Sequence, residues 1–170
     1  MEKTLNVLNK LEKKGLVERY AIGGGIAILY YAEPVLTYDI DVFCILPSER
    51  EELITLSPIY EYLQEKGYKA DGEHIVIEGV PVQLIPAYNK LVEEALNEAV
   101  EIKYKQTKTR IIRVEHLMAI MLQTYRPKDR ERMLLILAEI QIEMLYLEGV
   151  LEQHGLLKKW REFRRRYDEE

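Results

Sequence analysis

The sequence has little of several residue types on which common kinds of site depend. Its single cysteine, Cys44, lies in the apolar run 42–46, which excludes an intramolecular disulfide and predicts a buried, reduced thiol. Its three histidines, His74, His116 and His154, are far apart and have no ligand-like companions. We therefore expect surface or structural histidines and no zinc site. No apolar stretch has the length of a signal peptide or a membrane span, so we expect a cytoplasmic protein with no membrane partner.

An excess of basic residues is also missing. The 24 lysines and arginines are outnumbered by 29 acidic residues, which gives a formal net charge of −5. This balance argues against a broad basic surface for duplex nucleic acid, although a local patch could still bind a polyanion. Residues 158–167 mix basic and aromatic side chains, a combination that suits RNA. In an acidic protein, however, a solvated helix with Trp160 and Phe163 packed inward is the favoured interpretation.

The length and the apolar content predict a chain with a substantial core. With 170 residues, 48 % of them hydrophobic, the chain fits one domain or a domain with a helical extension. Hydrophobic periodicity predicts a mixed α/β half followed by an all-helical half. The expected strands are 16–22, 37–46 and the hairpin 74–78 with 81–85, with a less clear edge strand in 101–108. The expected helices are 4–14, 26–32, 49–53, 59–66, 89–100, 114–125, 129–139, 141–153 and a short final one.

Three consecutive glycines at 23–25 separate an expected strand from an expected helix. Such a turn points backbone N–H groups at an anion and lets a phosphate approach closely. A plain connector between strand and helix has the same pattern, and the glycines alone do not decide between the two. The spacing lacks the Gly-Lys-Ser/Thr of a Walker motif and the spread glycines of a dinucleotide fingerprint, so ATPase and dehydrogenase functions lose support.

Asp39 and Asp41 lie two residues apart on the next expected strand. Their side chains project from the same face, with Cα atoms about 6.6 Å apart, so both carboxylates can converge on one divalent cation. A solvated strand face is the alternative. It is disfavoured because the strand continues into the apolar run 42–46, where two adjacent negative charges are unfavourable unless a cation neutralises them.

The glycine turn, the helix and then residues 37–41 (Thr-Tyr-Asp-Ile-Asp) resemble the nucleotidyltransferase superfamily with the polymerase-beta-like core. Segments 117–119, 126–129, 146–148 and 154–156 resemble the helical part of its bacterial branch related to abortive-infection and toxin–antitoxin nucleotidyltransferases. The resemblance covers about residues 16–166. It implies an α+β fold, a nucleotidyltransferase-type mixed β-sheet with flanking helices plus a C-terminal helical bundle. We expect the α/β core at residues 1–112 and the helical region at 113–170.

The resemblance implies a metal-binding transferase that moves a nucleoside monophosphate from an NTP to an acceptor hydroxyl with Mg²⁺ or Mn²⁺. The acceptor would be an RNA end, such as that of a tRNA, or a protein, and an antitoxin would be a partner. The implied roles are metal binding and catalysis for Asp39 and Asp41, catalysis for Lys128 and Asp129, and nucleotide binding for the remaining residues, Gly24, Gly25, Thr37 and Arg126.

Three positions depart from the family pattern. The third carboxylate of the family corresponds to Gln83, whose amide oxygen can ligate magnesium but carries no charge and cannot act as a base. A lysine of related toxins corresponds to Met121, and a second acid to Arg132. Glu78, at the hairpin end, is a weaker candidate for the missing carboxylate. The alternative function is therefore a catalytically weakened protein of this fold that binds nucleotide or a partner without turnover.

Overall fold

A single mixed β-sheet organises the protein. The computed structural model describes residues 1–31, 39–47 and 55–168. The strand order is β3-β4-β5-β2-β1-β7-β6, with parallel pairing of β2 with β5 and of β1 with β7 and antiparallel pairing elsewhere. The strands are β1 (Arg19–Ile22), β2 (Ile40–Ile45), β3 (Lys69–Asp71), β4 (His74–Ile77), β5 (Val80–Pro86), β6 (Val100–Tyr104) and β7 (Thr107–Ile111).

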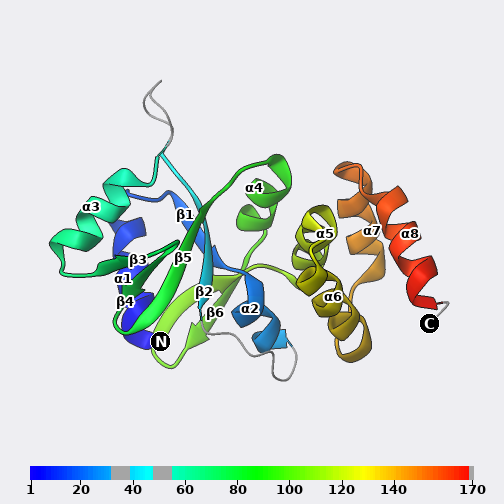
Figure 1. Cartoon of the computed structure of the whole chain (residues 1–170), viewed down its shortest axis with the longest axis horizontal. Coiled ribbons are helices and arrows are strands. Elements are labelled where there is room, and N and C mark those ends of the chain that lie inside the picture. Colours follow the sequence, from blue (N-terminus) through cyan, green and yellow to red (C-terminus); the bar gives the residue numbers. More distant parts are fainter. Residues whose placement is uncertain (32–38, 48–54, 169–170) are drawn as a thin grey trace.

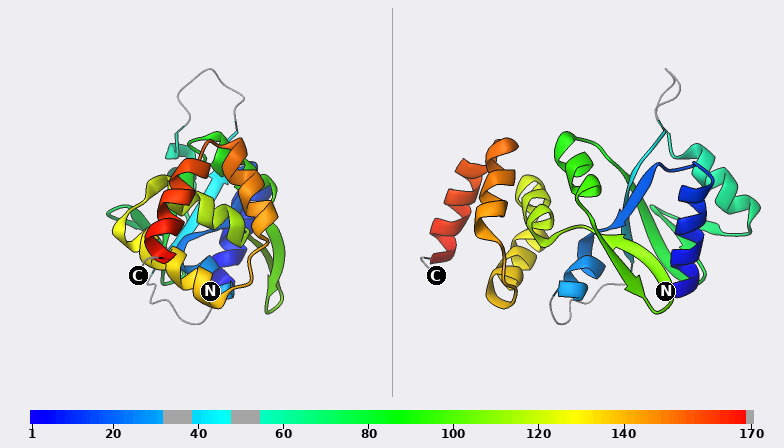
Figure 2. Two further views of the ribbon diagram at one scale, coloured as in Figure 1. Left: turned by 90° about the vertical axis from the view of Figure 1, so that its right-hand side faces the viewer. Right: turned by 180° about the vertical axis from the view of Figure 1, so that it is seen from behind.

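Helices flank the sheet and continue beyond it into a helical end. They are α1 (Glu2–Lys13), α2 (Gly24–Tyr31), α3 (Ser57–Glu65), α4 (Lys90–Asn97), α5 (Val114–Thr124), α6 (Pro127–Glu139), α7 (Met144–Gln153) and α8 (Leu157–Asp168). Helices α1 and α3 lie on one side of the sheet, whereas α2 and α4 lie on the other, between the sheet and α5–α8 (Figure 1). The view from behind gives the same arrangement (Figure 2). The α+β fold class with a C-terminal helical bundle is confirmed.

Two apolar clusters cover the two faces of the sheet. The first joins Ala21 and Phe43 of the sheet to α2, α4 and the C-terminal helices, and it includes Leu117 of α5 and Phe163 of α8. The second contains buried side chains of α1, α3 and the opposite sheet face, such as Leu5. Alternate residues of each strand face opposite sides, so β2 contributes to both clusters. The C-terminal helices thus share one continuous core with the sheet.

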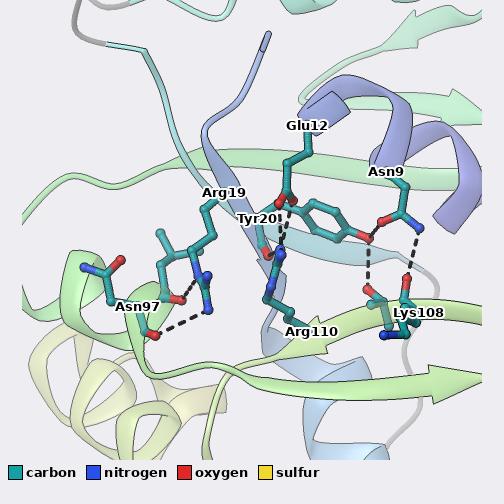
Figure 3. A network of polar contacts seen from close by, with 9 residues as sticks. Asn9, Glu12, Arg19, Tyr20, Asn97, Lys108 and Arg110 are labelled. Atoms are coloured by element: carbon teal, nitrogen blue, oxygen red, sulfur yellow. Dashed lines mark hydrogen bonds and ion pairs between the residues drawn. The ribbon is translucent and has the colours of Figure 1, made fainter. Parts of the chain in front are cut away.

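Polar contacts fix α1 against the sheet (Figure 3). Glu12 accepts two hydrogen bonds from the Arg110 guanidinium, each 2.9 Å long. The Tyr20 hydroxyl donates to Asn9 Oδ1 at 2.7 Å, and Arg19 donates to the backbone oxygen of Leu96 at the end of α4. A bidentate arginine–carboxylate pair fixes orientation as well as distance. These contacts therefore hold α1 and α4 in place relative to β1 and β7.

Several element predictions need correction. Helix α2 begins at Gly24 rather than at residue 26, and the final helix, α8, has 12 residues. The doubtful edge strand in 101–108 is part of a β6–β7 hairpin whose turn includes Lys105 at a φ of +53°. Strand β3 was not expected because its three residues are exposed and have no apolar pattern. The helix expected at 49–53 lies outside the described residues.

Among the described helices, none is long and apolar enough to cross a membrane.

Candidate active site

Asp39, Asp41 and Gln83 meet at the end of the sheet where β2 begins. Asp41 pairs with Gln83 across the parallel β2–β5 ladder. Paired residues in adjacent strands project from the same face of the sheet, so the Gln83 amide lies beside the Asp41 carboxylate. All three side chains line a cavity of about 220 Å³. The structure therefore brings the uncharged Gln83 amide to the same end of the cavity as the two aspartates.

Gly24 gives the Asp41 side chain its space. The residue has a φ of +54°, and a Cβ atom built on it would collide with the Asp41 carboxylate. Only glycine combines easy access to this backbone conformation with the absence of a side chain. Gly23 has a similar relation to the Phe43 ring. The absence of side chains at Gly23 and Gly24 thus makes room for the side chains of Phe43 and Asp41 in β2.

Cationic side chains from the start of α6 line the same cavity. Arg126 immediately precedes α6, and Lys128 and Arg132 lie within its first two turns. All three line the cavity and attract the Asp41 charge. Met121 lines the same cavity at the end of α5. The helix side of the cavity thus carries these three cations and one acid, Asp129, which pairs with Arg126. A cavity with acids from the sheet and an excess of cations from α6 suits a ligand that carries both a metal ion and phosphate groups.

Burial raises the pKa of Asp41 above its usual value, and the nearby Asp39 raises it further. Arg132, Lys128 and Arg126 oppose this shift without cancelling it. The ionised form of Asp41 is therefore less favourable in the fold than in an exposed aspartate, as expected of a carboxylate that a bound cation would stabilise.

Asp129 fixes the turn between α5 and α6. Its buried carboxylate accepts hydrogen bonds from the Thr124 hydroxyl at 2.8 Å, the Arg126 backbone N–H at 3.0 Å and Arg126 Nε at 2.8 Å. Burial alone raises the pKa of Asp129, but the hydrogen bonds from Arg126 and Thr124 outweigh burial and lower the pKa. Asp129 lines the cavity and, by these contacts, orients the Arg126 guanidinium.

His74 contacts the candidate site although its sequence context does not indicate this. It begins β4, and its Nε2 lies 3.0 Å from Asp39 Oδ2. The neighbouring Glu73 accepts a hydrogen bond from Gln83 Nε2 at 3.4 Å. The β3–β4 turn thus lies over the acidic side of the cavity. Only the sheet order, with β4 beside β5, brings His74 this close.

The two other histidines share one partner, Glu94, away from the candidate site. His116 Nε2 and His154 Nε2 lie 3.0 and 2.9 Å from the two carboxylate oxygens of Glu94. His116 is fully buried, and its Nδ1 has no hydrogen-bond partner. This cluster ties α4 to α5 and to the end of α7, in keeping with a structural role for both histidines.

The cavity gathers most of the residues named from the sequence. Seven of them line it: Gly24, Asp39, Asp41, Gln83, Arg126, Lys128 and Asp129. Gly25 is buried in the first turn of α2, and Thr37 lies outside the described residues. Glu78 does not line the cavity, and its carboxylate accepts a hydrogen bond from the Tyr68 hydroxyl at 2.8 Å. The suggestion that Glu78 supplies the missing carboxylate therefore has no support from its position.

The donor set suits a hard divalent cation but is incomplete. Two carboxylates and one amide provide oxygen ligands of the kind that Mg²⁺ and Mn²⁺ prefer. Within the part of the chain that the structure describes, no three His, Cys, Asp or Glu side chains are close enough together to hold a metal ion. Asp129 also lines the cavity, but its carboxylate accepts hydrogen bonds from Thr124 and Arg126, so Asp39, Asp41 and the Gln83 oxygen are the candidate ligands.

Fold and family define the class of protein. The structure resembles the crystal structure of an antigenic nucleotidyltransferase-like protein from Paracoccidioides brasiliensis, with a TM-score of 0.55, 14 % identity, and 95 % of this chain and 88 % of that chain covered. This likeness shows a nucleotidyltransferase-like fold. The chain belongs to the family described as "Nucleotidyl transferase of unknown function (DUF2204)", whose model matches residues 1–159. No curated protein matches the sequence.

Two structures of ANT(2'')-Ia match with lower TM-scores. The crystal structure in complex with adenylyl-2''-tobramycin has a TM-score of 0.45 at 17 % identity, with 96 % of this chain and 98 % of that chain covered. The solution structure, described as an antibiotic-resistance factor, has a TM-score of 0.49 at 15 % identity, with both chains fully covered.

Proposed function

We propose that the protein is a metal-dependent nucleotidyltransferase that transfers a nucleoside monophosphate from an NTP to an acceptor hydroxyl. The observation that carries this proposal is the two-sided cavity, in which Asp39 and Asp41 face the cations of the α5–α6 turn and of α6. In the reaction, the acceptor oxygen forms a bond to the α-phosphorus while the bond to the bridging oxygen breaks. Pyrophosphate leaves, and the hydroxyl proton passes to water.

One set of side chains would bind the metal ion, and another would bind the phosphates. Asp39, Asp41 and the Gln83 oxygen would hold Mg²⁺ or Mn²⁺, which supplies Lewis-acid polarisation and neutralisation of phosphate charge. Arg126 and Lys128 would orient the triphosphate, because their charges face the acids across the cavity. Gly24 keeps the Asp41 carboxylate in its position. The acceptor in this proposal is an RNA end, such as that of a tRNA, or a protein hydroxyl, within a toxin–antitoxin pair.

A second function is favoured by one specific observation. Gln83, which the resemblance to the family assigns to its third carboxylate position, pairs with Asp41 across the β2–β5 ladder and brings an uncharged amide there, whose nitrogen donates to Glu73. A site with two charged ligands binds metal more weakly than one with three. The second candidate is therefore a protein that binds nucleotide or a partner without turnover.

A transfer assay separates the two functions. The protein is incubated with Mg²⁺ or Mn²⁺ and each α-labelled NTP, with and without tRNA, and the label on RNA or protein is measured. Transfer by the wild type that is lost in Asp41→Asn supports the enzyme. No transfer by the wild type, together with transfer by Gln83→Asp, supports the second candidate. Gln64→Asp, which adds the same charge on the exposed surface of α3, serves as the control.

A further inference from the structure

A second cavity, the α6–α8 groove, lies beside the candidate active site. It has a volume of about 250 Å³, and its lining includes the aromatic side chains of Tyr125, Phe163 and Tyr167. Arg130 and Arg166 line it as well and are exposed, together with one acid, Glu131. Aromatic rings beside arginines are the features that bind successive bases and phosphates of a single strand.

The aromatic residues near this groove differ in how deeply they are buried. Trp160 and Phe163 stack on each other at 5.7 Å and are 5 % and 4 % exposed, so the expected inward packing of this pair is present. Tyr125 and Tyr167 are only partly buried. Their rings are thus accessible to a ligand from the groove, whereas Trp160 supports the wall from behind.

Tyr125 joins the two cavities. It ends α5 in the left-handed conformation, with a φ of +53°. This conformation is unusual for a bulky residue. Thr124 and Arg126 line the candidate active site, while Tyr125 lines the groove. A chain bound in the groove could therefore place one end at the active site.

The charge of α8 attracts a polyanion in an otherwise acidic protein. Between Leu157 and Asp168 the helix carries six basic and two acidic residues, against a net charge of −5 for the whole chain. Lys159 lies over the Tyr125 ring, 4.8 Å from its centroid, and Arg130 lies 5.5 Å from the same centroid. The Tyr125 ring is partly buried and also contacts the Phe163 ring. A base that stacks on Tyr125 would therefore replace one of these two cations on the ring, and the displaced cation would lie beside a phosphate.

We propose that the α6–α8 groove binds single-stranded nucleic acid, with bases stacked on Tyr125 and Tyr167 and phosphates held by Arg130 and Arg166. The inference rests on the proposed function in one respect: the bound strand is the acceptor whose end enters the active site. Binding itself needs neither NTP nor metal, so it can be tested separately from transfer.

The experiment measures the binding of a fluorescein-labelled, short single-stranded RNA, and of DNA of the same sequence, by fluorescence anisotropy without NTP or divalent ions. We expect Tyr125→Asn, which suits the left-handed backbone, to weaken binding roughly 5- to 150-fold, the range for one lost stacking contact. Arg130→Gln and Arg166→Gln are each expected to reduce the salt dependence by about one counterion. Arg161→Gln removes the same charge from an exposed position of α8 outside the groove and should do less.

The outcomes decide the proposal independently of catalysis. Binding of either oligonucleotide that is weakened by the groove variants, but not by Arg161→Gln or Asp41→Asn, supports it. Absence of binding by the wild type, equal binding of a duplex, or insensitivity to the groove variants would overturn it. If poly-glutamate binds more tightly than the oligonucleotides through the same arginines, the groove takes an acidic protein segment and the proposal is wrong. A failed transfer assay with intact binding contradicts the proposed enzyme alone.

Discussion

Replacing Gly24 by alanine tests whether the glycine turn exists to accommodate Asp41. The substitution forces a Cβ into the left-handed region and against the Asp41 carboxylate. The backbone term destabilises by about 1–2 kcal/mol, and overpacking adds about 1–3 kcal/mol. For a chain of this size, each kcal/mol lowers Tm by about 2–4 °C. Displacement of Asp41 by about 1 Å would in addition reduce transfer by about 10²-fold.

Gly15→Ala is the matched control for this substitution. Gly15 has a φ of +72° after α1, and a Cβ on it would meet nothing within 4 Å. Gly15→Ala therefore introduces the same backbone strain as Gly24→Ala but no collision with another side chain. Urea unfolding gives the stability of both variants, calorimetry with Mn²⁺ and ATP gives the affinity, and labelled ATP gives the transfer rate. If Gly24→Ala binds Mn²⁺ and ATP as well as Gly15→Ala does, the glycine does not serve Asp41 and the reasoning is refuted.

Three further predictions concern single groups. Asp41→Asn should raise the free energy of unfolding in the absence of metal, because the raised pKa of Asp41 means that its charge destabilises the fold. The same substitution should abolish stabilisation by Mn²⁺. Equal stability of the variant and the wild type in urea would contradict this prediction. Burial raises the pKa of Glu94, but hydrogen bonds from His116 and His154 outweigh burial and lower the pKa. Ionised Glu94 therefore stabilises the fold, and this stabilisation should be lost as the pH decreases through and below about 4.3. Thermal unfolding should show a smaller loss of stability at low pH in Glu94→Gln than in the wild type. Burial raises the pKa of Cys44 to about 12, so iodoacetamide at pH 8 should label it only as the protein unfolds.

The sequence was sufficient to predict the acidic side of the cavity. Strand alternation predicts Asp39 and Asp41 on one face, and both line the cavity although β2 itself begins at Ile40. The hairpin spacing brings the strand with Gln83 beside Asp41. Strand alternation and hairpin pairing are local properties, and they do not depend on where these strands lie in the sheet. The same holds for the C-terminal helices, whose apolar periodicity predicts α5, α6 and α7 to within a few residues.

What the sequence could not predict depends on contacts between distant segments. His74 reaches Asp39 only because β4 lies two strands away from β2, and His116 meets His154 only through Glu94 on a third helix. These separations leave no periodic signal along the chain. The role of Gly24 was ambiguous in the sequence for a different reason. A bound phosphate and the Asp41 carboxylate would each need a residue without a side chain at position 24.

The apolar cluster shared by the sheet and the C-terminal helices bears on how ligands would enter and leave. Moving α5 away from the sheet would expose Phe43, Leu117 and Met118, each at most 7 % exposed. Exposing about 200 Å² of such surface costs about 5 kcal/mol, so an opened state would hold roughly one molecule in several thousand. We therefore expect substrate exchange to proceed through side-chain movement of Arg126 and Lys128 at the rim, at rates set by those exposed cations rather than by separation of the helices from the sheet.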